Sequence, residues 1–214
     1  MDNRYRKWLG RKQGERCVKN LIGRGFDAHL AASAKAATAL VLNLVGDFET
    51  FGIGGSDTIR NVGLLEELRA MGKTLYDHWA PDLTPEEIHA LRLLQGRCDC
   101  FLCSVNAVTL QGELVSVDGI GNRVSAMTFG PRKVVVVAGV NKIVPDLEAA
   151  LRRVREVAAP MRARSLGLKT PCAETGECVD CRTGQRICNV TTILHRKPLS
   201  TDLSVVIVNQ ELGS

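Results

Sequence analysis

The stretch "KVVVVAG" (Lys133–Gly139) decides the fold class. It is a short run of β-branched residues without polar alternation, which is typical of a strand that is buried on both faces. The segments "DCFLCSV" (Asp99–Val105) and "LSVVIVNQ" (Leu203–Gln210) have the same character, and the helical pattern "PDLEAALRRVREVAAP" (Pro145–Pro160) follows the first run. Buried strands that alternate with helices predict an α/β fold, with a layered, mainly parallel sheet and helices on both faces.

The rest of the chain continues this alternation. Helices are predicted at about residues 4–23, 33–45, 56–72 and 84–95, and strands at 26–31, 47–53 and 73–77. The clearest boundary is Thr84-Pro85-Glu86-Glu87, a capping box with proline at the first helical position. The length of 214 residues suits one large domain, or one domain with a small appendage. Its most distinctive segments are an N-terminal basic helix (1–24) and a cysteine-rich loop (168–192).

Composition and charge argue against several classes of protein. Hydrophobic residues make up 45% of the chain and charged residues 24%, as in a soluble globular protein. The N-terminus is polar and basic, and the longest apolar run, Val134–Val140, is about a third of a membrane span, so we expect a cytoplasmic protein without a membrane segment. The net charge of +5 and the 4% aromatic content indicate solvated basic helix faces rather than nucleic-acid binding. An anionic small molecule or an acidic protein partner stays open.

A glycine-rich turn follows the strand predicted at residues 47–53. It reads Gly52-Ile53-Gly54-Gly55-Ser56-Asp57 and leads into a helix. Glycines allow close approach of the backbone to a ligand, and a helix N-terminus presents free N–H groups to an anion. The turn lacks the lysine of a P-loop and the third glycine of the dinucleotide fingerprint. Two interpretations remain open, an anion site or a tight turn in which Ser56 caps the helix.

Polar residues also collect after the other predicted strands. In open parallel sheets, ligands bind in the loops beyond the carboxyl ends of the strands. Asp118 could act there as a base or ligand, while Arg123 and Lys142 could hold a carboxylate or phosphate. The alternative is a purely structural role, in which these residues form turns and connect loops to the backbone through hydrogen bonds. The strand-exit residues are Asn106, Asp118, Asn122, Arg123, Asn141 and Lys142.

One strand exit reads as a hairpin. "VTL-QG-ELVSVD" has two strand-like arms around Gln111-Gly112, the length of a two-residue turn. That register sets two pairs of residues opposite each other: Leu110 with Glu113, and Val105 with Asp118. Asp118 would then return beside Asn106.

Four of the eight cysteines form the pattern Cys-x5-Cys-x2-Cys-x6-Cys, at Cys172, Cys178, Cys181 and Cys188. A Cys-x2-Cys knuckle with two further thiolates can bind a zinc ion, and an iron–sulfur cluster makes similar demands. A redox dithiol at the central pair or a loop of reduced cysteines stays open, whereas disulfides are unexpected in a reducing compartment.

A second cysteine group lies on or just before an apolar strand and reads as small buried hydrophobic residues. Strand alternation would put Cys98 and Cys100 on one face and Cys103 on the other.

Three segments resemble one known family. "GIGGSDTIRNVGLLEELRAMG", the long stretch from "NAVTLQGELVSVDGIGNR" to "REVAAP", and "PCAETGECVDCRTGQRICNVTTIL" look like the lactate-utilisation (LUD) domain family, in its small stand-alone branch with a C-terminal four-cysteine segment. The resemblance covers nearly the whole chain and implies a single LUD domain, 1–214. It also implies the fold of ribose-5-phosphate isomerase and CoA transferases. In that superfamily the glycine-rich turn and the strand-exit loops form the ligand site, which implies an anion-binding role for Gly54, Gly55 and Ser56, with Asn106, Asp118, Asn122, Arg123, Asn141 and Lys142 around it.

The resemblance leads to two hypotheses of a chemical function and to a third of a purely structural role. In the first, the protein is a component of lactate or other 2-hydroxy-acid utilisation, with Asp118 and Lys142 as catalytic residues and an iron–sulfur protein as partner. In the second, it acts alone on a sugar phosphate or acyl-CoA, with Asp118 or the less favoured Glu113 as base or nucleophile and a structural zinc. The third is a non-catalytic scaffold in a homo-oligomer.

Overall fold

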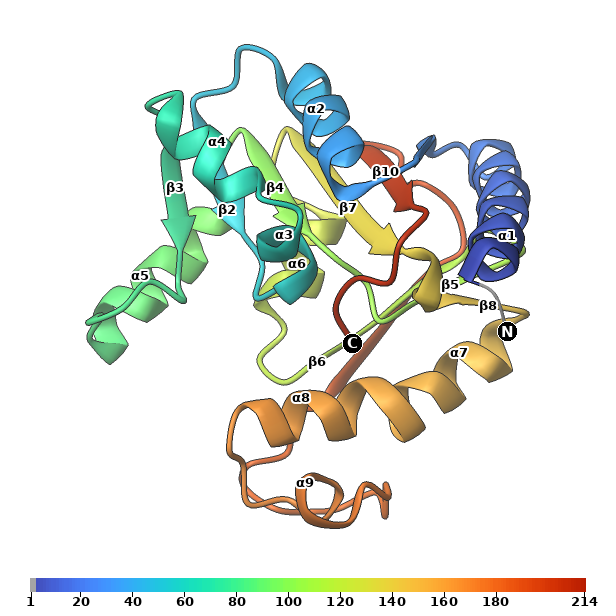
Figure 1. Ribbon diagram of the computed structural model, residues 1–214. Helices are drawn as coiled ribbons and strands as arrows, with labels where there is room; N and C mark the ends of the chain where they lie inside the picture. Colours follow the sequence, from blue (N-terminus) through green and yellow to red (C-terminus); the bar gives the residue numbers. More distant parts are fainter. Residues whose placement is uncertain (1–2) are drawn as a thin grey trace.

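The computed structural model describes residues 3–214 and has two sheets (Figure 1). The first two residues of the basic segment 1–24 lie outside the described residues. The large sheet consists, in spatial order, of β1 (Asp27–Ala31), β10 (Asp202–Val208), β7 (Lys133–Gly139), β4 (Cys100–Cys103), β2 (Thr50–Ile53) and β3 (Thr74–Asp77). All of its neighbouring strands pair in parallel. The small sheet consists of β8 (Ile143–Val144), β5 (Ala107–Thr109), β6 (Leu114–Asp118) and β9 (Val190–Leu194).

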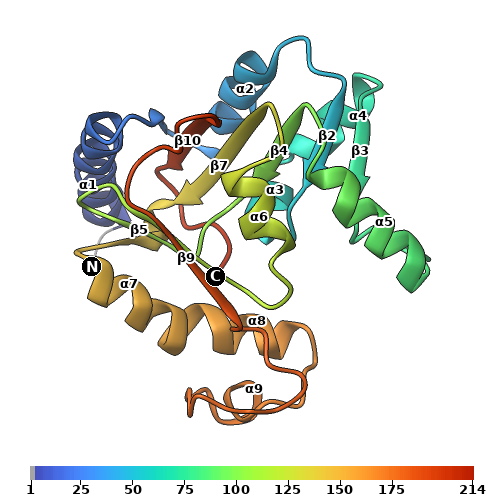
Figure 2. The same ribbon diagram turned by 180° about the vertical axis from the view of Figure 1, so that it is seen from behind.

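Helices cover both faces of the large sheet, as Figures 1 and 2 show from opposite sides. The predicted α/β layered fold is therefore confirmed. The helices are α1 (Asn3–Gly23), α2 (Ala34–Val45), α3 (Asp57–Asn61), α4 (Leu64–Ala70), α5 (Pro85–Gln95), α6 (Asn122–Thr128), α7 (Leu147–Arg153), α8 (Ala159–Ser165) and α9 (Pro171–Thr175). A 3₁₀ turn, η1 (Val140–Lys142), follows β7, and a π-helical segment, η2 (Val154–Ala158), joins α7 to α8.

Strand β7 shows why its sequence is apolar throughout. Every residue of the strand is buried. Val134 and Val136 join the core cluster that contains residues of α1 and α6, whereas Val135 and Val137 join the cluster that contains residues of α2, α3 and α4. Burial of a valine side chain stabilises the fold by about 1.5–3 kcal/mol, so both helical layers are held to this strand.

Two expectations about single elements are wrong. The helix predicted at 56–72 is divided into α3 and α4, because Gly63 has a left-handed backbone with φ of 78°. Cys98 does not share a face with Cys100: it lies in the core cluster of Cys103, because β4 begins only at Cys100 and Cys98 is outside the strand alternation. The burial of all three cysteines is confirmed.

The hairpin has a register one residue away from the predicted one. Val108 pairs with Leu114, and the N–H of Thr109 donates to the carbonyl of Glu113, which leaves a three-residue turn. Gly112 has φ of 89° and supplies the extra left-handed residue of such a turn. Glu113, directly after this turn, is 8% exposed, and its carboxylate pairs with Arg24 at 2.9 Å.

The small sheet lies against the large one and is covered by α7. Ala150 of α7 packs with Ala107 and Val115. Figure 1 shows α7, η2 and α8 as one long ribbon along this sheet, with α9 and the cysteine segment beneath it. Within residues 3–214, no helix is both long and apolar enough to cross a membrane.

Candidate functional site

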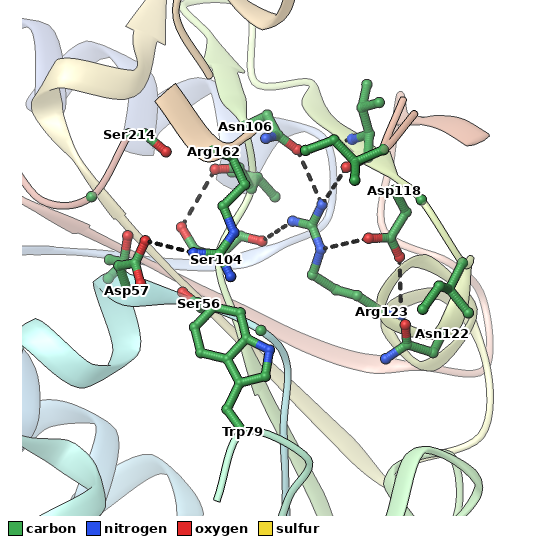
Figure 3. A pocket seen from close by; sticks show the side chains of 18 of the residues that line it. Ser56, Asp57, Trp79, Ser104, Asn106, Asp118, Asn122, Arg123, Arg162 and Ser214 are labelled. Atoms are coloured by element: carbon green, nitrogen blue, oxygen red, sulfur yellow. Dashed lines mark hydrogen bonds and ion pairs between the residues drawn. The ribbon is translucent and has the colours of Figure 1, made fainter. Parts of the chain in front are cut away.

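A crevice of about 300 Å³ lies beyond the carboxyl ends of β2 and β4, where the topology of a parallel sheet places ligand sites. Figure 3 shows its side chains converging from the loops after these strands, from β6 and α6, and from α8. Most of the site residues predicted from sequence line it: Gly55, Ser56, Asn106, Asp118, Asn122, Arg123 and Lys142. Gly54 and Asn141 do not line it.

Arg123 holds the walls of the crevice together. Its guanidinium donates to the carbonyls of Ser104 and Val117, both at 2.7 Å, and to Oδ1 of Asn106 at 3.1 Å. Its Nε lies 3.5 Å from the Asp118 carboxylate. Most of its N–H groups therefore already have acceptors within the protein. Arg123 positions the ends of two strands and does not offer a free pair of N–H donors to a ligand.

Asp118 and Asn106 are brought together through this arginine. The Asp118 carboxylate also accepts from the backbone N–H groups of Arg123 and Val124 at 3.1 and 3.2 Å. Oδ1 of Asn106 accepts from the N–H of Val117 at 2.8 Å. The proximity of the two side chains therefore agrees with the expectation, although the hairpin register does not.

Lys142 is the least conventional group in the crevice. It is 4% exposed, and its Nζ contacts Oγ of Ser104 and Oγ1 of Thr58 at 3.1 Å and the carbonyl of Val105 at 3.2 Å. Burial, followed by the charges of Arg153 and Arg123, lowers the pKa of Lys142 to about 7. The amine is therefore poised to exchange a proton near neutral pH.

Trp79, Arg162, Arg92 and His78 also line the crevice, and sequence reasoning missed them. The guanidinium of Arg162 lies 4.2 Å from the centre of the Trp79 ring and 3.5 Å from the Asp57 carboxylate. Burial lowers the pKa of His78, whose Nδ1 lies 2.8 Å from the Gln95 amide. The available signal was "DHW" (Asp77–Trp79) at the end of β3, another strand exit. Arg162 has no comparable signal, because it stands in a run of arginines on a helix.

The glycine-rich turn is shaped by packing. The N–H of Gly54 donates to the Leu102 carbonyl at 2.9 Å, so it is not free for an anion. A Cβ on Gly55 would lie 2.6 Å from the Trp79 ring, so the absence of a side chain makes room for the indole. Ser56 accepts from the N–H of Ile59 and caps α3. Of the two interpretations left open, this geometry favours the tight turn.

Asn141 lies outside the crevice and ties down the end of the described chain. Its Nδ2 donates to the Gly213 carbonyl at 3.2 Å, and its Oδ1 accepts from the N–H of Leu212 at 3.0 Å. This segment lies against the lysine, because a Cβ on Gly213 would be 3.3 Å from Nζ of Lys142. Asn141 therefore holds in place the segment that packs against Lys142.

The four cysteines of the C-terminal segment line a second cavity, of about 110 Å³. Its other wall is mainly apolar and comes from β6 and from the α7–η2–α8 helix, with Val117, Leu151, Val154 and Ala159. Arg186 organises the cysteine segment, since it donates to the carbonyls of Cys181 and Cys188 at 2.7 and 3.1 Å. Four thiols around one cavity are a donor set that suits zinc or an iron–sulfur cluster. Within residues 3–214, no group of three or more His, Cys, Asp or Glu side chains is already arranged to hold a metal ion.

Comparison with known protein families identifies one match. The sequence profile of the LUD domain matches residues 14–208. Among solved structures, a DUF162 family protein from Deinococcus radiodurans is similar over 93% of this chain and 98% of its own, with 13% sequence identity and a TM-score of 0.55. This likeness concerns the fold. A search of curated proteins found no match.

Proposed function

Because the chain belongs to the LUD domain family, which is associated with lactate utilisation, we propose that it binds a small 2-hydroxy or 2-oxo carboxylate in the crevice. Its role would be that of a component of 2-hydroxy-acid utilisation. The observation that carries the proposal is the charge balance of the crevice. Asp57 is paired with Arg162 and Asp118 with Arg123, so Arg92 and Lys142 line the same cavity without a carboxylate partner among residues 3–214.

The guanidinium of Arg92 and the amine of Lys142 suit an anion with a second polar group. Nε of Arg92 is buried and has no hydrogen-bond partner among the described residues. The Arg92 side chain lines the crevice, where its guanidinium can hold a carboxylate through charge-assisted hydrogen bonds. The Lys142 amine and its hydroxyl neighbours Ser104 and Thr58 would meet the oxygen at C2, and Asp118 is the nearby carboxylate for proton transfer.

Calorimetry tests this proposal. We expect lactate or pyruvate to bind, and Arg92→Gln or Lys142→Met to weaken binding about tenfold or more, as the loss of a charged hydrogen bond does. Arg97→Gln is the matched control, because it removes the same charge from an exposed position after α5. Absence of heat with both acids, or equal binding by all variants, would refute the proposed ligand site.

The second part of the proposal concerns the cysteine cavity. Cys172, Cys178, Cys181 and Cys188 would hold a zinc ion or an iron–sulfur cluster. A zinc ion would brace the segment, whereas a cluster would supply electron transfer. Oxidation of a 2-hydroxy acid to a 2-oxo acid releases two electrons and two protons, and we assign the electrons to an iron–sulfur protein partner.

Metal and sulfide analysis with a visible spectrum, on protein purified without air or chelators, separates the two groups. Iron, sulfide and a broad charge-transfer band indicate a cluster, and one zinc per chain without colour indicates a structural site. Cys181→Ser should lower the metal content, and Cys17→Ala, a buried cysteine outside the cavity, should leave it unchanged. Protein without metal in every preparation would refute this part.

A phosphorylated ligand is the second candidate for the crevice. The volume of about 300 Å³ reaches the range of sites for ligands larger than lactate. Guanidinium groups such as those of Arg92 and Arg162 also suit phosphate. The same calorimetry with a sugar phosphate and with CoA decides between the candidates. Tighter binding of either compound than of lactate and pyruvate would favour a phosphorylated ligand over the small carboxylate.

A further inference from the structure

The surroundings of Lys142 differ from those of an ordinary buried lysine. A buried ammonium is normally paired with a carboxylate. Lys133, the first residue of β7, follows this rule, because its Nζ lies 2.9 Å from the Asp202 carboxylate. Lys142 is as deeply buried, yet all three atoms within hydrogen-bond distance of its Nζ are neutral oxygens.

These three oxygens accommodate a neutral amine. An NH2 group has two N–H donors and one lone pair, and the Val105 carbonyl can only accept. The hydroxyls of Thr58 and Ser104 can each accept or donate, so the set satisfies a neutral amine as well as an ammonium. Arg123 and Arg153 add positive charge nearby and oppose protonation. Desolvation beside other cations is the known means of activating a lysine as a nucleophile.

We propose that Lys142 forms a reversible Schiff base with the C2 carbonyl of a 2-oxo carboxylate in the crevice. This inference rests on the proposed function for its class of ligand. The lone pair of Nζ adds to the carbonyl carbon, and the carbonyl oxygen takes up a proton to give a carbinolamine. Loss of that hydroxyl with a proton from nitrogen releases one water and leaves the C=N bond. No oxidant or reductant is required.

The structure supplies the other parts of this step. The hydroxyls of Ser104 and Thr58 both lie 3.1 Å from Nζ and can pass protons between nitrogen and oxygen. Arg92, which has no carboxylate partner among the described residues, is the group that would hold the ligand carboxylate. A 2-hydroxy acid has no carbonyl and would bind without this bond, so the lysine distinguishes the two members of the ligand class.

Reductive trapping tests the inference on the full chain. The protein is incubated with pyruvate and sodium borohydride, and the modified lysine is located by peptide mass mapping. We expect one reduced adduct per chain on Lys142, about tenfold or more above Lys133, the internal control with similar burial and a carboxylate partner. Lactate should give no adduct. Lys142→Arg, which keeps a cation, should abolish trapping.

The outcomes separate this inference from the proposed function. An adduct confined to Lys142 supports the Schiff base. An adduct spread over exposed lysines, or no adduct although calorimetry shows that pyruvate binds, overturns the Schiff base and leaves the ligand site standing. No binding and no adduct overturns both.

Discussion

Replacement of Lys142 by methionine should change how the stability of the protein depends on pH. In the folded protein the pKa of this lysine is lowered to about 7, whereas an unfolded chain has the ordinary value of 10.5. Between these values the unfolded state binds more protons, so the free energy of unfolding rises with pH. The destabilisation is fully present below about pH 7 and is gone above about pH 10.5.

The magnitude follows from proton linkage. One proton taken up on unfolding corresponds to about 1.4 kcal/mol per pH unit, which integrates to about 2 kcal/mol between pH 7 and pH 9 because the folded lysine is half titrated at the lower limit. The groups that act on Lys142 are Arg153, Arg123 and Asp57, from three different helices.

Urea denaturation at several pH values is the suitable assay. Other titrations occur in both proteins, so the difference between wild type and Lys142→Met isolates the lysine. We expect wild type to gain about 2 kcal/mol over the variant from pH 7 to pH 9. A difference that stays constant over this range would show that Lys142 keeps an ordinary pKa and would refute a neutral amine at this position.

Three further substitutions test the packing that shapes the site. Arg123→Met removes the hydrogen bonds that join the strand exits, so we expect a loss of about 2–4 kcal/mol in urea denaturation, and a loss below about 1 kcal/mol would contradict the clamp. Gly55→Ala should displace Trp79, cost about 1–3 kcal/mol and shift the tryptophan emission, whereas an unchanged spectrum would show that the indole has room. Thr84→Ala removes the side-chain cap of α5 and should cost about 1 kcal/mol in thermal or urea unfolding; equal stability would show that the capping box is dispensable.

The fold was predictable because its determinants are local. The apolar strands and the capping box of α5 each have a signature within a few neighbouring residues. The errors occurred where one residue changed the geometry. Gly63 interrupts a helix, and Gly112 lengthens a turn and shifts a register. A glycine in sequence does not reveal whether its φ is positive, so these breaks had to come from the structure.

The location of the crevice was also predictable, but the contacts of the residues that line it were not. Strand exits of a parallel sheet meet at one edge, which is why the residues after β2, β4 and β7 converge, and the end of β6 in the small sheet brings Asp118 and Arg123 to the same crevice. Whether an arginine binds a ligand or the protein depends on atoms from distant elements. Arg123 donates to the Ser104 carbonyl after β4 and to the Val117 carbonyl in β6, while Arg92, which no motif marks in α5, has a buried Nε without a partner among residues 3–214.

The crevice and the cysteine cavity share strand β6, so substitutions of the cysteines can also affect the crevice. Val117 lines both cavities. The residue after Cys188, Asn189, donates its N–H to the carbonyl of Asp118 at 3.0 Å, and Asp118 pairs with Val190 of β9. A disturbance of the cysteine segment therefore reaches the backbone that carries Asp118 through main-chain hydrogen bonds. Loss of ligand binding in a Cys188 variant would accordingly be expected from the fold alone. Whether the proposed metal acts on the ligand must therefore be tested on wild-type protein, in which all side chains are in place, before and after treatment with a chelator.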